Sequence, residues 1–258
     1  MDDRRPEEIN QPDIAAGMFL IDKPRGETSF SMVRHVRRLL RQKKVGHAGT
    51  LDPFATGLLI ICAGRQATRM IDRCMAGKKV YTAVLQLGSE TETMDPEGRI
   101  VRTAPVPNLS SEQITSCLEE FTGRMMQVPP PYSAVKYKGK PLYYYARKGI
   151  AVVKEPRQVE IYSLAVVDYD GDGHRLTIDV ACSKGTYIRV LADDIGRKLG
   201  CGAHLSELRR LSSGGFTVED SLPGDALSGP DAREILMQRM IPVDKLLAML
   251  GEEENLRQ

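Results

Sequence analysis

The chain has 258 residues, of which 41% are hydrophobic and 27% charged, a composition typical of a soluble globular protein with one large domain. Its apolar runs are too short to cross a bilayer, and its five cysteines are scattered without a C-x-x-C pair, which argues against a disulfide framework and a zinc site. The beginning of the chain is acidic and lacks the apolar stretch of a secretory signal, so we expect a cytoplasmic protein that binds no membrane.

The net charge of +2 hides an uneven distribution. Residues 1–16 carry a net charge of −3 and residues 218–258 a net charge of −5, which leaves +10 on the body between them. A basic body with acidic ends predicts a polyanionic partner. Residues 1–16 also lack periodicity, and we expect them to form a flexible tail.

The body begins with a strand and a helix. GMFLID, residues 17–22, predicts a short buried strand, and the turn-rich KPRGETS follows it. Apolar residues at helical spacing then predict a helix over 29–42, capped by Thr28 or Ser29. The opposite face of this helix carries arginines, which either lie in solvent or bind phosphate groups.

The segment GHAGTLDPFATGLL, residues 46–59, places Asp52 among small residues and directly before Pro53. Small residues allow another backbone or a flat ligand to approach closely. Because proline suits the first turn of a helix, the local pattern predicts Asp52 as the N-cap of a helix over 54–58.

The rest of the body interleaves helices and strands without a regular βα repeat, which predicts an α+β fold with a mixed sheet. Helices are expected over 67–75, 110–121, 189–200 and 203–211, and strands over 78–88, 159–169 and 174–183. The aspartates between the last two strands match the start of a calcium loop, but their flanks alternate like strands, which favours a hairpin turn. Beyond residue 217 the acidic chain predicts two helices, over 231–240 and 243–250.

Residues 124–157 have a composition of their own. They hold eight Lys or Arg and one acidic residue, Glu155, together with five of the nine tyrosines. Cations interleaved with aromatic rings are typical of a contact with single-stranded or looped RNA. The alternative is a tyrosine-rich helix packed on the core with its lysines in solvent.

Taken together, five motifs make the chain similar to the TruB family of tRNA pseudouridine synthases over residues 17–216: KPRGETS, GHAGTLDPFATGLL, KKVYTA, YSAVKYKGKPLYYYARKG and CSKGTYIRV. The resemblance implies a pseudouridine-synthase catalytic domain over residues 17–217, with a mixed, mostly antiparallel bent sheet and flanking helices and loops. It implies isomerisation of uridine 55 in the T-loop of tRNA, without cofactor or metal. It also implies that residues 124–157 are a mobile insertion that closes over the T-arm. We expect a monomer.

The resemblance also assigns catalytic residues. Asp52 matches the family's catalytic aspartate, and Arg189 matches the arginine that pairs with it and would lower its pKa. The carboxylate would act as a nucleophile at C1′, stabilise a sugar intermediate or take part in a glycal route, and the residues do not choose among these. Tyr81 matches the tyrosine that stacks on the target base, and its hydroxyl is a candidate proton acceptor that needs help from its neighbours.

Four further positions match substrate-binding residues of the family. Tyr187 and Leu208 would line the uracil pocket, and His47 would fill the space vacated by the extruded nucleotide. Lys23 belongs to the first family motif, where it would mainly support the catalytic loop. Without the resemblance, these side chains would be interpreted as ordinary core or turn residues.

The chain departs from the family at its end. Many members carry a β-rich PUA domain there, whereas residues 218–258 are expected to form a short acidic helical extension and no full PUA domain. The alternative function is a non-catalytic tRNA-binding or folding protein on the same scaffold. The joint presence of Asp52, Arg189 and Tyr81 favours the enzyme, because a protein that only binds tRNA needs none of them together.

Overall fold

The computed structural model describes residues 16–152 and 154–255. Its main sheet is built from β1 (Gly17–Lys23), β3 (Thr56–Ala63), β4 (Lys79–Leu87), β7 (Gly123–Gln127), β10 (Arg157–Asp170), β11 (Arg175–Cys182), β12 (Ala203–Ser213) and β14 (Leu222–Pro223). The strand order is β14-β1-β3-β12-β4-β11-β10-β7. Three short strands pair beside this path, β2 (Val45–Ala48), β13 (Phe216–Thr217) and β15 (Ile241–Pro242).

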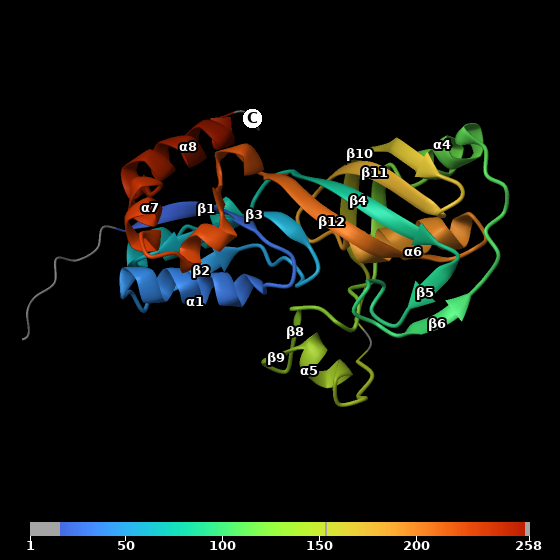
Figure 1. Cartoon of the computed structure of the whole chain (residues 1–258), viewed down its shortest axis with the longest axis horizontal. Coiled ribbons are helices and arrows are strands. Elements are labelled where there is room, and N and C mark those ends of the chain that lie inside the picture. The colour runs from blue at the N-terminus through green and yellow to red at the C-terminus, as the bar shows by residue number, and fades with distance from the viewer. Residues whose placement is uncertain (1–15, 153, 256–258) are drawn as a thin grey trace, which may run out of the picture.

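Helices and two small hairpins surround this sheet (Figure 1). The hairpins are β5 (Ser89–Thr91) with β6 (Ile100–Thr103) and β8 (Lys136–Tyr137) with β9 (Lys140–Pro141). The helices are α1 (Ser29–Leu40), α2 (Arg65–Thr68), α3 (Ile71–Cys74), α4 (Ser111–Glu119), α5 (Leu142–Ala146), α6 (Ile188–Lys198), α7 (Ala232–Gln238) and α8 (Val243–Asn255), with 3-10 turns η1 (Val218–Asp220) and η2 (Gly224–Ser228). The predicted α+β class with a mixed, mostly antiparallel sheet is confirmed, because within the described ranges only β1–β14 and β3–β12 pair in parallel.

Strand β12 joins two halves of the sheet, β14-β1-β3 on one side and β4-β11-β10-β7 on the other. It pairs antiparallel with β4 along most of its length, whereas it meets β3 at only two positions, Arg209 opposite Thr56 and Arg210 opposite Gly57. Gly57 has a φ of 99°, and a side chain there would collide with the Arg210 backbone. The close approach of the two halves therefore requires glycine at this position.

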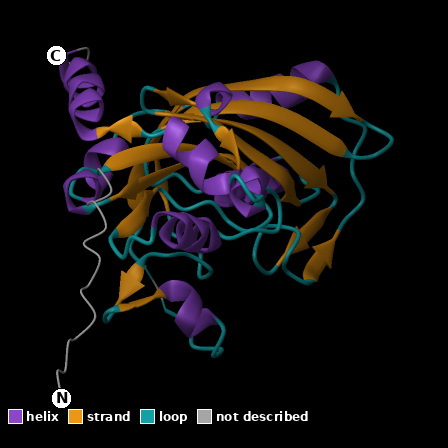
Figure 2. Ribbon diagram, turned by 60° about the vertical axis from the view of Figure 1, so that its left-hand side comes forward, coloured by secondary structure: helices purple, strands orange, loops and turns teal. Residues whose placement is uncertain are grey.

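Two hydrophobic clusters cover opposite faces of β3. Its alternate residues Leu59 and Ile61 belong to the larger cluster, which β4, β11, β12, α1 and α6 complete, while Leu58 and Ile60 face the smaller one. A strand buried on both faces has a continuous apolar sequence, which explains TGLLIICA. Figure 2 shows helices lying against the sheet on both sides.

Most expected elements are present. The strands over 17–22, 78–88, 159–169 and 174–183 and the helices over 29–42, 110–121 and 189–200 are confirmed within a few residues, as are the two helices beyond residue 217. Thr28 caps α1, since its hydroxyl accepts a hydrogen bond from the Ser31 amide at 2.9 Å. The helix expected over 67–75 is divided into α2 and α3.

The helix predicted over 203–211 is wrong, because these residues form β12. Leu205, Leu208 and Leu211 lie three residues apart, as on a helix. The strand produces this spacing because its pairing with β4 shifts register twice, between Leu205 and Glu207 and between Arg210 and Ser212. Each bulge inserts a residue and interrupts the alternation that identifies a strand.

The helix cap predicted at Asp52 is also wrong. Pro53 and Phe54 form a turn, and β3 begins at Thr56. The Pro53 carbonyl accepts hydrogen bonds from the Gly26 amide at 2.8 Å and the Lys23 ammonium at 3.2 Å. Asp52 therefore lies on a loop that another segment of the chain holds in place.

The basic segment 124–157 begins and ends inside the sheet, since residues 124–127 belong to β7 and residue 157 starts β10. The part between them contains β8, β9 and α5 and extends below the sheet in Figure 1. Its mobility stays a prediction. The predicted tail, residues 1–16, lies outside the described residues except for Ala16.

The acidic extension packs against the main sheet through α8, whose Leu246 and Leu250 are buried in the smaller hydrophobic cluster. No helix in residues 16–152 and 154–255 is long and apolar enough to span a membrane.

Candidate active site

A cavity of about 580 Å³ lies where the two halves of the sheet meet. Five of the predicted site residues line it, namely Asp52, Tyr81, Tyr187, Arg189 and Leu208. They come from the loop before β3, from β4, from the start of α6 and from β12, so the fold gathers them from distant parts of the sequence. The other two predicted residues, His47 and Lys23, do not line the cavity.

Asp52 and Arg189 form an ion pair, with 2.9 Å between Arg189 Nε and Asp52 Oδ2. Only 4% of the Arg189 side chain is exposed, whereas 35% of the Asp52 side chain is exposed. A charge-assisted contact of this kind fixes the direction of the carboxylate. Asp52 is thus held by a buried partner and accessible from the cavity.

The same guanidinium binds two other segments. Arg189 Nη1 lies 3.3 Å from Asp95 Oδ2 and donates to the Thr93 carbonyl at 2.9 Å. Its Nη2 donates to the Tyr132 carbonyl, at the base of the basic insertion, at 2.8 Å. Asp95 is buried and was missed from the sequence, where its surroundings TETMDPEGRIV indicate only a turn before a strand.

Burial is the largest influence on Asp52 and raises its pKa above the usual carboxylate value. The charge and hydrogen bonds of Arg189 act in the opposite direction, while the negative charge of Asp95 adds to the increase. The predicted lowering by Arg189 is therefore present, but desolvation outweighs it. The carboxylate loses its charge at a higher pH than an exposed aspartate does.

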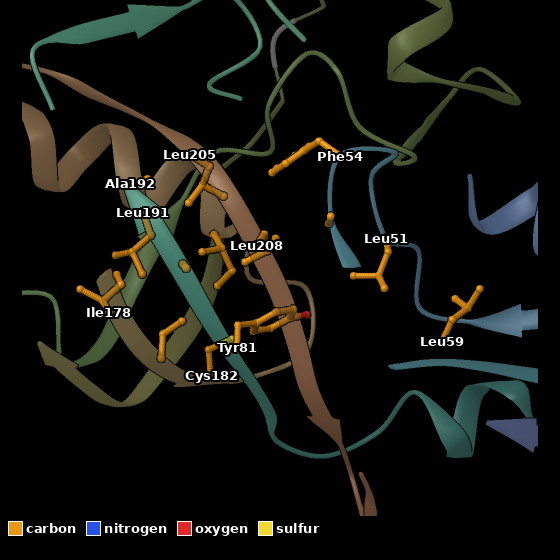
Figure 3. Close-up of a cluster of buried hydrophobic side chains, with 14 of the residues drawn as sticks. Leu51, Phe54, Leu59, Tyr81, Ile178, Cys182, Leu191, Ala192, Leu205 and Leu208 are labelled. Atoms are coloured by element: carbon orange, nitrogen blue, oxygen red, sulfur yellow. The ribbon is translucent and has the colours of Figure 1, made fainter. Parts of the chain in front are cut away.

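Tyr81 lies on β4 within the larger hydrophobic cluster and is 6% exposed. Figure 3 shows its ring among apolar side chains, with the phenol oxygen on the side toward the loop that carries Leu51. Burial raises the pKa of the phenol, and the positive charge of Arg210 acts against this increase. Tyr81 can therefore present a ring face and a hydroxyl to a ligand in the cavity.

Lys23 supports the loop that carries Asp52. Its buried ammonium donates to the carbonyls of Pro24 at 2.8 Å, Glu27 at 2.6 Å and Pro53 at 3.2 Å. Burial lowers its pKa to about 8. Its contacts agree with a supporting position, and its contact with a substrate stays a prediction.

The remaining predicted residues occupy different environments. Tyr187 precedes α6, and the Gln127 amide binds its backbone N–H at 2.7 Å and its carbonyl at 3.1 Å. Leu208 contributes an apolar wall from β12. His47 lies half-buried on β2, where burial, and less strongly Arg210, lower its pKa and keep the imidazole neutral.

Within the described ranges, no group of three or more His, Cys, Asp or Glu side chains is arranged to hold a metal ion. The cavity is surrounded by a partly exposed carboxylate (Asp52), a buried guanidinium (Arg189), a buried phenol (Tyr81) and an apolar wall. Its volume can accommodate a nucleobase.

Comparison with known proteins identifies the family. Residues 37–188 match the TruB family pseudouridylate synthase N-terminal domain, and residues 189–248 match the tRNA pseudouridylate synthase B C-terminal domain. The chain belongs to the TruB family of pseudouridylate synthases. It is therefore an enzyme of the isomerase class.

The curated relatives agree with this family. The chain is 55% identical to tRNA pseudouridine synthase B of Desulfotalea psychrophila, over 94% of this chain and 100% of the relative. It is 46% identical to tRNA pseudouridine synthase B of Aromatoleum aromaticum, over 95% of this chain and 78% of that one.

Among solved structures, a chain of a Cbf5-Nop10-Gar1 complex aligns with a TM-score of 0.67 and 29% identity, over 90% of this chain and 62% of that one. A chain of an H/ACA RNP bound to a substrate RNA aligns with a TM-score of 0.65 and 25% identity, over 90% of this chain and 61% of that one. This chain therefore spans less than two thirds of the chains in those complexes. They confirm the pseudouridine-synthase fold.

The two matched segments meet between Ile188 and Arg189, inside α6. The cavity combines residues from both, because Asp52 and Tyr81 lie before this boundary and Arg189 and Leu208 lie after it. Both matched segments therefore build the cavity.

Proposed function

We propose that this protein isomerises uridine 55 in the T-loop of tRNA to pseudouridine, with Asp52 as the catalytic carboxylate. The observation that carries the proposal is the ion pair of Asp52 with Arg189 at the edge of a cavity lined by Tyr81, Tyr187 and Leu208. The family membership and the relatives named tRNA pseudouridine synthase B support uridine in tRNA as the substrate.

The target base has to leave its stack before the reaction, because the atoms that react are enclosed in the folded loop. The cavity receives the flipped uridine, with Tyr81 against the base and Tyr187 and Leu208 as its apolar walls. The reaction then breaks the N1–C1′ bond, turns the uracil and forms the C5–C1′ bond. Asp52 faces the sugar, where its ionised carboxylate acts on C1′ or on C2′.

Recognition of the T-arm rests on the basic segment 124–157. Its cations and rings lie close together in the structure. The Nζ atoms of Lys140 and Lys148 are 4.2 and 4.6 Å from the centre of the Tyr144 ring. Such a surface offers charge to phosphates and ring faces to unstacked bases. The segment is joined to the active site through the Tyr132 carbonyl, which Arg189 binds.

The test uses a tRNA transcript tritiated at C5 of uridine, because formation of the C5–C1′ bond expels that hydrogen. Wild-type protein is expected to release tritium and Asp52→Asn to release it at least about 100-fold more slowly, since loss of a positioned catalytic group costs factors of this order. Asp172→Asn, in the exposed β10–β11 turn, is the matched control and should retain the wild-type rate.

The outcomes separate the functions. Wild-type protein that binds tRNA without releasing tritium would identify a non-catalytic tRNA-binding protein, and equal release by Asp52→Asn would remove Asp52 from the mechanism. We further propose that the enzyme acts in the cytoplasm as a monomer, without metal or cofactor. A chelator should then leave the rate unchanged, and the protein should elute in size-exclusion chromatography at the size of one chain.

A further inference from the structure

Arg210 is a large, almost fully buried side chain in the wall of the cavity, with 1% of its surface exposed. It lies at the middle of the sheet, where its backbone is opposite Gly57 of β3 on one side and Tyr81 of β4 on the other. Side chains at directly opposed positions of neighbouring strands lie on the same face and contact one another. The register therefore places the Arg210 guanidinium beside the Tyr81 ring.

The guanidinium connects three parts of the site. Arg210 Nε donates to the Leu58 carbonyl at 2.7 Å, and Nη2 donates to the Gly49 carbonyl, in the loop before Asp52, at 3.1 Å. Its positive charge also acts on the adjacent Tyr81 phenol, whose pKa it lowers. One side chain thus holds the loop before Asp52 and the start of β3 together, beside the phenol on the neighbouring strand.

The charge of Arg210 lacks a carboxylate partner. Among the residues that the structure describes, none forms an ion pair with it, and its hydrogen-bond acceptors are the carbonyls of Leu58 and Gly49. A buried cation without an anion is costly for a fold. An anion that forms beside it is correspondingly stabilised, and the phenol is the adjacent group able to become one.

We propose that Arg210 is a positioning residue of the isomerisation, which orients the Tyr81 hydroxyl and supplies the positive charge that Tyr81 needs to accept a proton. The inference rests on the proposed function. In the step concerned, C5 has formed its bond to C1′, the C5–H bond breaks, and its electron pair returns to the uracil ring. The proton passes to the Tyr81 phenolate, N1 takes up a proton from solvent, and the phenol later returns its proton to solvent.

The other groups that face Tyr81 do not supply this charge. Cys182 from β11 and Asp52 from the catalytic loop both raise the pKa of the phenol, as does burial among apolar side chains. Arg210 from β12 acts in the opposite direction. Of burial, Cys182, Asp52 and Arg210, only Arg210 therefore favours the ionised form of the phenol.

The experiment measures single-turnover release of tritium from C5-tritiated tRNA across pH, with the full chain carrying Arg210→Gln or Arg210→Lys. Arg210→Gln is expected to reduce the rate at least about tenfold and to move the rise of rate with pH upward by about one unit, because a nearby opposite charge shifts a pKa by one to three units. Arg210→Lys should retain part of the rate, since it keeps the charge and loses the fork of donors.

A change of the phenol itself distinguishes a chemical role from a structural one. A fluorinated tyrosine at position 81 has a more acidic phenol and should restore part of the rate of Arg210→Gln. Arg209→Gln is the matched control on the same strand, where Arg209 pairs with Asp22 at 2.7 Å on the other face of the sheet, and its pH profile should remain that of the wild type.

Loss of rate in Arg210→Gln without a displaced pH profile and without rescue by the fluorinated tyrosine would overturn the inference. If Arg210→Gln does not fold, fluorinated tyrosines in the wild-type protein decide the question, because the rise of rate with pH must follow the acidity of the phenol. A profile that ignores this acidity also overturns the inference. Wild-type protein that releases no tritium contradicts the proposed function instead.

Discussion

Arg189 divides one positive charge between two carboxylates of unequal accessibility. Asp95 is buried to the same extent as the arginine, whereas Asp52 reaches the cavity. Because both carboxylates contact one guanidinium, the negative charge of Asp95 acts on Asp52 and raises its pKa. We interpret Asp95 as a fixed counterion that sets the environment of Asp52 without access to the substrate.

Asp95→Asn should move the pH dependence of the enzyme. The negative charge of Asp95 contributes to the raised pKa of Asp52, so its removal lowers that pKa. The acid limb of the pH–rate profile is then expected at lower pH than in the wild type. Tritium release between pH 4 and 8 measures this shift, and an acid limb displaced to higher pH would contradict the arrangement.

At the residue scale, the family motifs predict the cavity residues that lie within them and do not predict the buried charged residues that contact them. Asp52, Tyr81 and Arg189 lie within motifs of the family, and the structure brings them together. Asp95 and Arg210 could not be inferred, because their significance depends on contacts with residues 94 and 152 positions away in the chain, Arg189 and Leu58. Local patterns contain no information about such contacts.

At the scale of elements, local periodicity predicted the helices and strands whose environment is uniform along their length. Helix α1 has one buried face and one solvated face, and its pattern shows both. Strand β12 differs because two bulges interrupt its alternation. The turn at Asp52 was misinterpreted for another reason, since tertiary hydrogen bonds from Lys23 and Gly26 decide the conformation of Pro53.

Gly57→Ala tests the crossing of β3 and β12. Glycine tolerates the φ of 99°, and an added methyl group would meet the Arg210 backbone, so both strain and collision act against alanine. We expect the free energy of unfolding to fall by more than about 3 kcal/mol. Gly139→Ala is the control, since its φ is also positive but open space surrounds it. Equal losses in chemical denaturation would contradict the close approach.

Asp193→Asn tests the packing of α6. Burial raises the pKa of Asp193 from 3.8 to about 6, so the folded state retains a proton that the unfolded state releases. The contribution of this group to stability is therefore present below about pH 4 and is lost as pH rises to 6, by up to about 3 kcal/mol. Chemical denaturation at several pH values should show that the free energy of unfolding falls less between pH 4 and 6 for Asp193→Asn than for the wild type. The substitution Glu207→Gln, at an exposed position, should leave the wild-type decrease unchanged.

At the scale of the whole molecule, the positive charge and the cavity both lie in the body of the chain, where a polyanion would bind. The body carries +10 and the two ends together −8, so a polyanion is attracted to the body and repelled from the ends. The cavity lies in the body, and the basic segment 124–157 forms part of its wall through Gln127, Pro129 and Ser133.

Binding of tRNA should depend strongly on salt. The logarithm of the association constant is expected to fall linearly with the logarithm of salt concentration, because phosphate contacts release counterions. Lys140→Gln with Lys148→Gln should reduce the magnitude of the slope by about one to two. Lys245→Gln, on α8 in the acidic extension, should leave the slope unchanged. Identical slopes in filter-binding titrations would exclude the two lysines from phosphate contact.

The position of β12 in the sheet has a consequence for how the protein is made. β12 lies between β3 and β4, yet the ribosome synthesises it after β1 to β11, and nothing else in the described sheet joins the two halves. Contacts of such long sequence separation form late and slowly during folding. A nascent chain that ends before residue 203 therefore carries Asp52, Tyr81 and Arg189 without a common cleft, and it acquires its enzymatic capacity only as the last fifth of the chain is completed.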